Sequence, residues 1–579
     1  MTNYIKLIFL ISFLILNSIF LIRPAQAVVD PLSTPNNKFG VHIITGSPDE
    51  ASPAAQMVNS SGGDWGYITV LIESKNRNHD QWQAFFNDLR RRHLIPLVRI
   101  ATEPEGNYWK IPYNGEEQAW ADFLDSLVWP TKNRYVIIYN EPNQGQEWAG
   151  KVDPASYAQV LDKTITALKN KNPDFFVLNA GLDASAPDKY PSYADETTFL
   201  SQMEAAVPGI FNKLDGWVSH SYPNPGFAGS PDASGRGTVR TWAWELNYLK
   251  NLGVNKTLPV FITETGWKHA EGLDYDKSLP NADTVADYLK DAFTNAWNSS
   301  QIVAVTPFLL NYQQAPFDHF SFKKLTGEPQ NLKILGASYP DYYPPYQAMM
   351  DLPKVAGHPF QENKAALVKG TIYPSIVAGE SYTIPLTFKN TGQSIWEDGE
   401  PLELRVLSGG DDFGIQSIQP AIAQKVEPGQ NAIFNVNLKA PQGGDYQITL
   451  QLFHGGKAFD QNPFVFNTKV KSPVILQVKT SLWGKKNSAG SYLLTILNNA
   501  FKSSVEVTID DQGISKPLES RYLLPDYPFT FTLHKPFYKP KSINVQVVSG
   551  INQLNFGTLE PDFLSAILNP KEFWDLLPF

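Results

Sequence analysis

Two glutamates in this chain stand in settings where carboxyl groups could do chemistry. Glu141 lies in Tyr-Asn-Glu-Pro-Asn (139–143) and Glu264 in Thr-Glu-Thr-Gly-Trp (263–267), each after an apolar, β-branched run. Hydrolysis of a glycosidic bond with retained configuration needs two carboxyl groups about 5 to 5.5 Å apart, one to attack the anomeric carbon and one to protonate the leaving oxygen. Glutamates 123 positions apart (264 − 141) can meet only if their strands converge on one mouth.

The runs that could position these glutamates are spread over the first 320 residues. They are near-continuously hydrophobic, as expected of parallel strands covered on both faces. They lie at residues 38–44, 66–72, 95–100, 135–139, 175–180, 215–222, 259–263 and 303–311. Helical patterns lie between them, such as residues 153–170, where Asp153 can cap the helix and Pro154 suits its first turn. Eight strands alternating with helices predict a (β/α)8 TIM barrel over residues 28–355, whose active site belongs at the C-terminal ends of the strands.

From about residue 370 the hydrophobic period changes to two, which is typical of antiparallel sandwiches. We predict two β-sandwich domains, an immunoglobulin-like one at residues 365–471 and a second β-rich one at 472–579. The first resembles bacterial immunoglobulin-like modules that carry Asn-Thr-Gly (390–392) and a following Trp, here Trp396. These domains are expected to act as spacers or to contact polysaccharide or the cell surface. The amphipathic C-terminal tail, residues 561–579, is expected to pack against another domain or to contact a partner.

The N-terminus predicts export. Lys6 precedes an apolar stretch at residues 7–22, and Arg-Pro-Ala-Gln-Ala (23–27) offers an A-x-A arrangement, so residues 1–27 are typical of a signal peptide cleaved after Ala27. The protein would then be secreted or extracytoplasmic. The alternative is a stretch that stays uncut and tethers the chain to a membrane. No membrane partner is otherwise required.

Composition excludes several classes of function. A formal net charge of −9 gives no electrostatic reason to expect nucleic acid or an anionic membrane as partner. The absence of Cys excludes disulfides, thiolate metal sites and a Cys nucleophile. No residue pattern indicates a catalytic metal, a phosphate-binding loop or a cofactor site.

Together with the strand order, Asn140-Glu141-Pro142 and Glu264 resemble the glycoside hydrolases of clan A. These are retaining enzymes on a (β/α)8 barrel and include many cellulases, mannanases, xylanases and β-glycosidases. The resemblance implies that Glu141 is the general acid/base and Glu264 the nucleophile of a double displacement, in a secreted enzyme of polysaccharide degradation that needs no cofactor or metal. One departure is the end of the eighth strand, where many clan members carry a Trp and this chain has Phe308.

The same resemblance suggests residues that bind the carbohydrate substrate. It implies that Asn140 contacts the sugar 2-hydroxyl; the alternative is an ordinary turn residue. His220 and Tyr222, in a His-Ser-Tyr order, are similar to the His-x-Tyr pair of the family-five cellulase group, where both line the glycone site and the Tyr contacts the nucleophile. The alternative is an aromatic pair packed in the core. Arg99, near the end of the third strand, could hold the nucleophile ionised or form a structural ion pair.

Three tryptophans follow strands, where flat indole faces could stack on pyranose rings: Trp267, Trp148 and Trp109. Core or loop packing is the alternative for each.

Two other functions remain open at this stage. A non-catalytic carbohydrate-binding or cell-surface protein could keep the barrel as a scaffold, because a fold does not imply an activity. A transglycosylase would use the same residues with an acceptor sugar in place of water.

Overall fold

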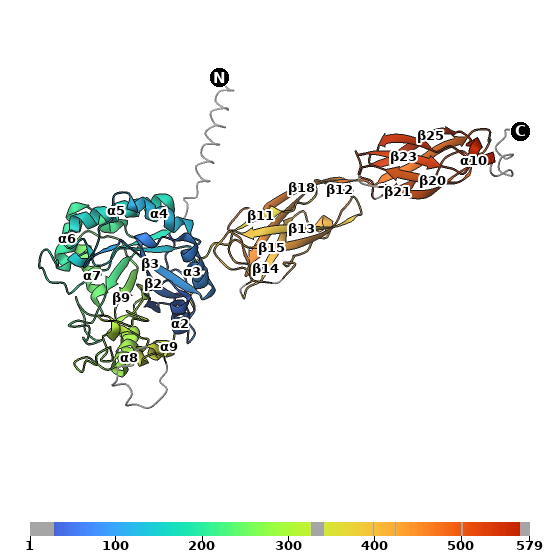
Figure 1. The fold of residues 1–579 in the computed structure, drawn as a ribbon. Helices are drawn as coiled ribbons and strands as arrows, with labels where there is room; N and C mark the ends of the chain where they lie inside the picture. Colours follow the sequence, from blue (N-terminus) through green and yellow to red (C-terminus); the bar gives the residue numbers. More distant parts are fainter. Residues whose placement is uncertain are drawn as a thin grey trace, which may run out of the picture. The chain divides into compact units, whose positions relative to one another are not determined.

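The computed structural model describes residues 28–325, 341–397, 399–422, 424–499, 502–520 and 522–567 (Figure 1). The predicted signal peptide and residues 568–579 of the predicted tail lie outside the described residues. The chain divides into two compact units, Met1–Glu362 with Gly392–Ile395, and Asn363–Thr391 with Trp396–Phe579. Among the described residues, no helix has the length and hydropathy needed to cross a bilayer.

The first unit contains eight parallel strands that follow one another in chain order. They are β1 (Gly40–His42), β2 (Gly66–Glu73), β3 (Leu94–Ala101), β6 (Arg134–Ile138), β7 (Phe175–Leu178), β8 (Trp217–His220), β9 (Val260–Glu264) and β10 (Ile302–Val305). Five pair in the order β1-β2-β3-β6-β7 and three in the order β8-β9-β10. Parallel bridges Phe39–Val305 and Leu178–Gly216 join the two sheets at both edges, so the strands form a closed ring.

A helix follows each strand of this ring. The helices are α2 (Pro48–Val58), α3 (His79–Arg91), α4 (Glu116–Ser126), α5 (Pro154–Lys171), α6 (Glu196–Ala206), α7 (Thr241–Asn251), α8 (Ala282–Asp291) and α9 (Pro344–Asp351), and a short hairpin of β4 (Pro104–Glu105) and β5 (Tyr108–Trp109) follows β3. In Figure 1 the strands occupy the middle of this unit and the helices lie around them. The predicted cap of α5 is confirmed, because the side chain of Asp153 accepts a hydrogen bond from Ser156 N at 3.0 Å.

The strands of the ring are hydrophobic on both faces because both faces are buried. In β2, Ile68, Val70 and Ile72 belong to the core shared with the helices, whereas Tyr67 belongs to a separate core inside the ring. Alternate residues of a strand point to opposite faces, so a ring covered by helices needs apolar residues at successive positions. This explains the near-continuous hydrophobic runs of the sequence.

The second unit contains two separate hydrophobic cores, each between two sheets. The first has sheets β11-β13-β15 and β12-β18-β16-β14, with β17 paired to β16; the second has sheets β22-β19-β25 and β21-β20-β23-β24. The bounds are β11 (Ala365–Lys369), β12 (Ser375–Val377), β13 (Ser381–Asn390), β14 (Leu402–Ser408), β15 (Asn431–Lys439), β16 (Gly444–His454), β17 (Lys457–Ala458), β18 (Phe464–Lys471), β19 (Val474–Leu482), β20 (Gly490–Leu497), β21 (Lys502–Ile509), β22 (Leu518–Ser520), β23 (Pro528–His534), β24 (Lys541–Gln546), β25 (Gly550–Leu559) and a last helix α10 (Phe563–Ile567).

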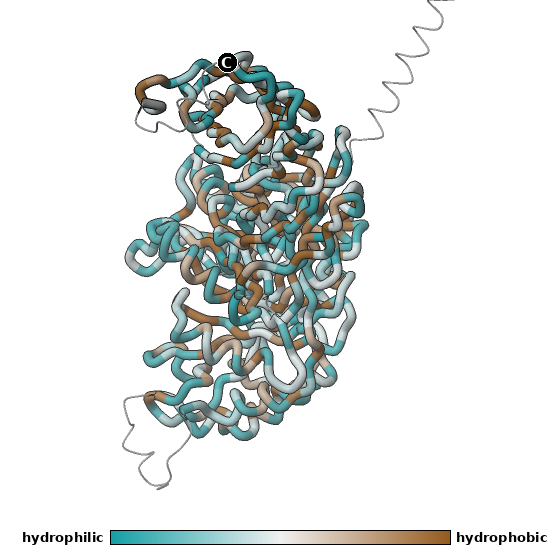
Figure 2. Tube along the Cα trace, turned by 90° about the vertical axis from the view of Figure 1, so that its right-hand side faces the viewer, coloured by the Kyte–Doolittle hydropathy of each residue, from teal (hydrophilic) through white to brown (hydrophobic). Residues whose placement is uncertain are grey.

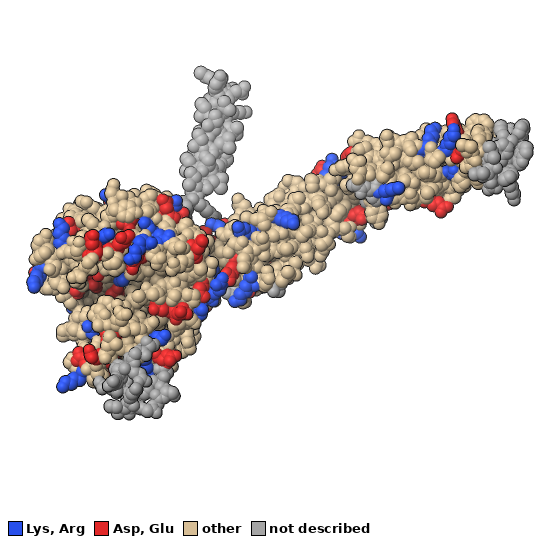
Figure 3. Space-filling model, in the orientation of Figure 1, with Lys and Arg blue, Asp and Glu red and all other residues tan. Residues whose placement is uncertain are grey.

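The strands of these two cores are buried on one face only. Buried and exposed residues alternate strictly along β15, and short brown and teal stretches follow one another along the tube in Figure 2. Trp396 is fully buried in the first of these cores, where its ring contacts Phe459. Acidic and basic side chains are interspersed over the face shown in Figure 3, without a large area of one sign.

Candidate active site

The C-terminal ends of the strands in the ring bring Arg99, Glu141, His220, Tyr222 and Glu264 to one cleft of about 740 Å³. Arg99 lies near the end of β3, Glu141 lies three residues beyond β6, His220 ends β8, and Glu264 ends β9. All strands of the ring run parallel, so their C-terminal ends open at one mouth. The structure therefore places the two glutamates together, although they are far apart in sequence.

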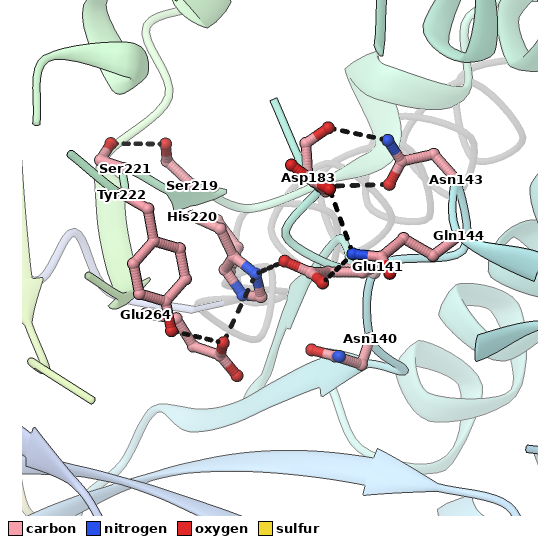
Figure 4. A network of polar contacts seen from close by, with 12 residues as sticks. Asn140, Glu141, Asn143, Gln144, Asp183, Ser219, His220, Ser221, Tyr222 and Glu264 are labelled. Carbon is pink, nitrogen blue, oxygen red and sulfur yellow. Dashed lines mark hydrogen bonds and ion pairs between the residues drawn. The ribbon is translucent and has the colours of Figure 1, made fainter. Parts of the chain in front are cut away.

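The backbone around Glu141 is strained. Tyr139 has φ 70° and Glu141 has φ 28°, values that residues with a side chain rarely adopt. Such conformations cost on the order of 1–3 kcal/mol each and persist where the surrounding structure holds them. Here the N–H of Glu141 donates to the carbonyl of Gly181 at 3.1 Å, which ties the residue to the segment after β7. The Glu141 carboxyl points toward His220 (Figure 4), and the residue lines the cleft.

Glu264 is surrounded by groups that favour its ionised form. Arg99 Nη1 donates to Oε1 at 2.5 Å and the Tyr222 hydroxyl donates to Oε2 at 3.1 Å, while His220 Nδ1 lies 3.8 Å from Oε2 (Figure 4). Burial alone would raise the pKa of Glu264, but His220, Arg99 and His42 outweigh burial and lower the pKa to about 2. Glu264 is therefore a carboxylate at neutral pH.

The surroundings of Glu141 favour its protonated form. Its Oε1 lies 2.7 Å from His220 Nδ1, and its Oε2 accepts from Gln144 Nε2 at 2.8 Å. Burial raises the pKa of Glu141, and the charges of Glu264 and Asp183 raise it further, against the lowering effect of His220. One oxygen of Glu141 lies within 4.8 Å of one oxygen of Glu264. Two neighbouring carboxyl groups with pKa values moved apart can act as acid and nucleophile.

Asn140 and Arg99 form a second contact at the floor of the cleft. Arg99 Nη1 donates to Asn140 Oδ1 at 2.6 Å as well as to Glu264. One guanidinium nitrogen thus fixes both the carboxylate and the neighbouring amide. The Asn140 side chain also hydrogen-bonds Glu147, and the second proton of its amide nitrogen can donate to a ligand.

The nearest candidate for a metal site is the same cluster. Ligand atoms of Glu141, His220 and Glu264 lie within 4.8 Å of one another. The Arg99 guanidinium already donates to Glu264 Oε1, so its positive charge lies beside this cluster and opposes the binding of a cation. This donor set suits a pair of reacting carboxyl groups better than a metal ion.

The structure corrects the prediction that Trp148 and Trp267 bind sugar. Each is only 2% exposed. Trp148 packs edge-on between Tyr139 and Tyr157, and the Trp267 indole donates to Gly229 O at 2.7 Å while packing against Tyr288 and Trp297. Neither indole offers a free face. Trp109, at the end of the β4–β5 hairpin, does line the cleft.

The sequence did not indicate several residues of the cleft. An aromatic wall joins Phe308 and Tyr312, at and just beyond the end of the predicted eighth strand, to Phe227, Phe317 and Phe320. Polar additions are Gln144, Glu147 and Asp183. Burial, followed by the charge of Glu141, raises the pKa of Glu147 to about 7. Gln144 and Glu147 lie within six residues of Glu141, a proximity that could have indicated them, whereas nothing in the sequence marks Asp183.

His220 requires a glycine opposite it. A Cβ at Gly181 would lie 2.1 Å from His220 Cδ2 and 2.4 Å from Nε2, so Gly181→Ala is expected to displace the imidazole from Glu141 and to lower the free energy of unfolding by about 1–3 kcal/mol. Urea denaturation measures this loss. Gly443→Ala, in the second unit, is the control for an added methyl without a clash, because its nearest neighbours would stay at 3.5 Å. An unfolding transition of the first unit that Gly181→Ala leaves unchanged would contradict the steric argument.

In comparisons with known proteins, no family model and no curated protein matches the chain. Similar solved structures include a family 39 glycoside hydrolase from Bacteroides cellulosilyticus WH2, at 14% identity and a TM-score of 0.37, covering 71% of this chain and 82% of that one. A family 30 subfamily 8 xylanase from Clostridium acetobutylicum matches at 12% identity and a TM-score of 0.33, covering 72% and 98%. A β-mannanase from Thermomonospora fusca matches at 14% and 0.31, covering 49% and 82%. Because these sequence identities and TM-scores are low, the assignment of function rests on the geometry of the site.

Proposed function

We propose that this chain is a secreted, retaining β-glycoside hydrolase that acts on an oligo- or polysaccharide, built as a (β/α)8 barrel followed by two β-sandwich domains. The observation that carries the proposal is the carboxyl pair of the cleft. Oxygens of Glu141 and Glu264 come within 4.8 Å of each other, close to the roughly 5 Å of retaining enzymes and well below the roughly 6.5–9.5 Å that leaves room for a water in inverting ones.

In the first step, the Glu264 carboxylate attacks the anomeric carbon, and the bond from that carbon to the glycosidic oxygen breaks. Glu141 gives its proton to the departing oxygen, so the leaving sugar departs as a neutral alcohol. Glu141, now ionised, then takes a proton from water, and the resulting hydroxide displaces Glu264 from the anomeric carbon. Two displacements at one carbon restore the original configuration, and both glutamates return to their starting protonation states.

Other residues of the cleft support these two steps. Tyr222 and Arg99 each donate to one oxygen of Glu264, which orients the carboxylate and leaves further lone pairs available for attack. Asn140, oriented by Arg99, is placed to donate to the sugar 2-hydroxyl. The aromatic wall and Trp109 present ring faces on which the apolar faces of pyranose rings can stack.

The proposal also covers export of the protein and the role of its two C-terminal domains. Export would follow cleavage after Ala27, and N-terminal sequencing of the exported protein tests this. The two C-terminal domains would hold the catalytic unit near polysaccharide or the cell surface.

The proposal is tested by intact mass after incubation of residues 28–579 with 2-deoxy-2-fluoro β-glycosides that carry activated leaving groups. The fluorine slows both steps because it destabilises their transition states. The activated leaving group restores the rate of the first step only, so the glycosyl-enzyme accumulates. We expect a stoichiometric adduct on wild type that maps to Glu264, and none on Glu264→Ala. An adduct on another residue would overturn the assignment of Glu264 as the nucleophile. No adduct from a panel covering the common glycones would overturn the retaining assignment and favour a carbohydrate-binding protein.

A further inference from the structure

The carboxyl of Glu141 is held from two sides, by His220 on the side of Glu264 and by Gln144 on the other side. His220 contacts Oε1, whereas Gln144 Nε2 donates to Oε2 at 2.8 Å. The same Gln144 nitrogen lies 3.2 Å from Oδ2 of Asp183 (Figure 4). A side-chain amide nitrogen has two protons. Gln144 can therefore give one proton to Glu141 and one to Asp183.

Asp183 is itself held in place by hydrogen bonds, so it offers Gln144 an acceptor at a fixed position. Its backbone N–H donates to Asn143 Oδ1 at 3.1 Å, and Asn143 Nδ2 donates back to its carbonyl at 2.9 Å. Its Oδ1 accepts from Ser185 N at 2.9 Å, which leaves Oδ2 for Gln144. Asn143 and Gln144 both follow Glu141 directly after β6, whereas Asp183 follows β7. The contacts thus tie the segment that carries the acid to the neighbouring strand of the ring.

We propose that Gln144 and Asp183 are positioning residues for Glu141: Gln144 fixes Oε2 toward the leaving oxygen, and the negative charge of Asp183 keeps the proton on Glu141 until a substrate arrives. This deepens the proposed function and rests on it, because Glu141 is the acid only if the chain cleaves glycosides.

The two residues act on Glu141 in opposite directions. The N–H of Gln144 bonds to a carboxyl oxygen, which favours the ionised form of Glu141, whereas a nearby negative charge favours the protonated form. Other charged or titratable groups face Glu141 from the surrounding elements, and they are present in every variant below: Glu147 from the turn after β6, His220 from β8, Tyr222 from the segment after β8, and Glu264 from β9.

The test compares Asp183→Asn with Gln144→Met in the exported chain. Asp183→Asn removes the charge but keeps an oxygen for Gln144, so the pKa of Glu141 should fall, by about one pH unit for a charge at this range in a partly buried site. Gln144→Met keeps the length of the side chain but removes the donor, so the pKa of Glu141 should rise. A role limited to folding would not produce shifts of opposite sign.

Infrared difference titration reads the protonated Glu141 carboxyl directly, with each variant paired to its own Glu141→Gln derivative. The alkaline limb of kcat/KM should move with it, because the reaction needs protonated Glu141. Asp188→Asn is the matched control: it makes the same charge change on an exposed residue of the same loop, where solvent screens the effect.

Opposite shifts of the Glu141 pKa in the two variants support the proposal. Shifts of the same sign, or none beyond that of Asp188→Asn, overturn it. Should Asp183→Asn fail to fold, Gln144→Met decides alone, since an unchanged Glu141 pKa there would remove the basis of the proposal. The infrared readout needs no substrate, so opposite shifts in a protein that forms no glycosyl adduct would refute the hydrolase assignment while leaving this coupling intact.

Discussion

Glu264→Ala is expected to lower kcat on a β-glycoside by about 10⁴- to 10⁶-fold, the range lost when a covalent nucleophile is removed. The carboxylate sits at the end of β9 with Arg99 and Tyr222 fixed on it. Steady-state kinetics on an aryl β-glycoside measures the loss.

A small anion separates loss of the nucleophile from general damage to the site. Removal of the Glu264 carboxyl leaves space beneath the anomeric carbon, where azide can attack in its place. One displacement instead of two gives a glycosyl azide of inverted configuration, whereas Glu105→Ala, at an exposed carboxyl of the nearby hairpin, should behave as wild type. Binding of substrate to Glu264→Ala, measured by calorimetry, should persist. Turnover of Glu264→Ala at the wild-type rate would contradict the nucleophile assignment.

The strands of the ring could be predicted from sequence because their burial leaves a local signature. Strands covered on both faces must be apolar at successive positions, so the predicted runs 66–72 and 95–100 agree with β2 (Gly66–Glu73) and β3 (Leu94–Ala101) within a residue. The run at 303–311 extends well beyond β10 (Ile302–Val305), because Phe308 belongs to the aromatic wall of the cleft and Leu309 and Leu310 are fully buried.

Site residues that lie within a strand could be predicted from sequence, whereas most of those in loops could not. Arg99, His220 and Glu264 lie within strands, so the ring alone brings them to one mouth. Trp148 and Trp267 lie in loops, where local sequence does not decide which face a side chain takes, and neighbouring aromatic residues bury both. Asp183 reaches Glu141 only through Gln144, a contact between two segments that no local pattern encodes.

Glu141→Gln should show a loss that depends on the leaving group. With an alkyl or sugar leaving group, departure needs the proton of Glu141, so kcat/KM should fall by about 10²- to 10⁴-fold. With a dinitrophenolate leaving group, which departs without a proton, kcat/KM should stay within about tenfold of wild type. Kinetics on a series of aryl glycosides measures this, and the slope of log kcat/KM against leaving-group pKa should become steeper in the variant.

The same substitution should also slow the second step, because Glu141 takes the proton from water. A glycosyl-enzyme formed from a dinitrophenyl glycoside should then accumulate on Glu141→Gln, visible as a burst of dinitrophenolate and as an adduct in the intact mass. Added azide needs no general base, so it should clear this adduct and, as the second of two displacements, give a product of retained configuration. The inverted azide product of Glu264→Ala and the retained product of Glu141→Gln therefore assign the two glutamates independently of each other. Equal losses on all leaving groups would contradict a role of Glu141 as the acid.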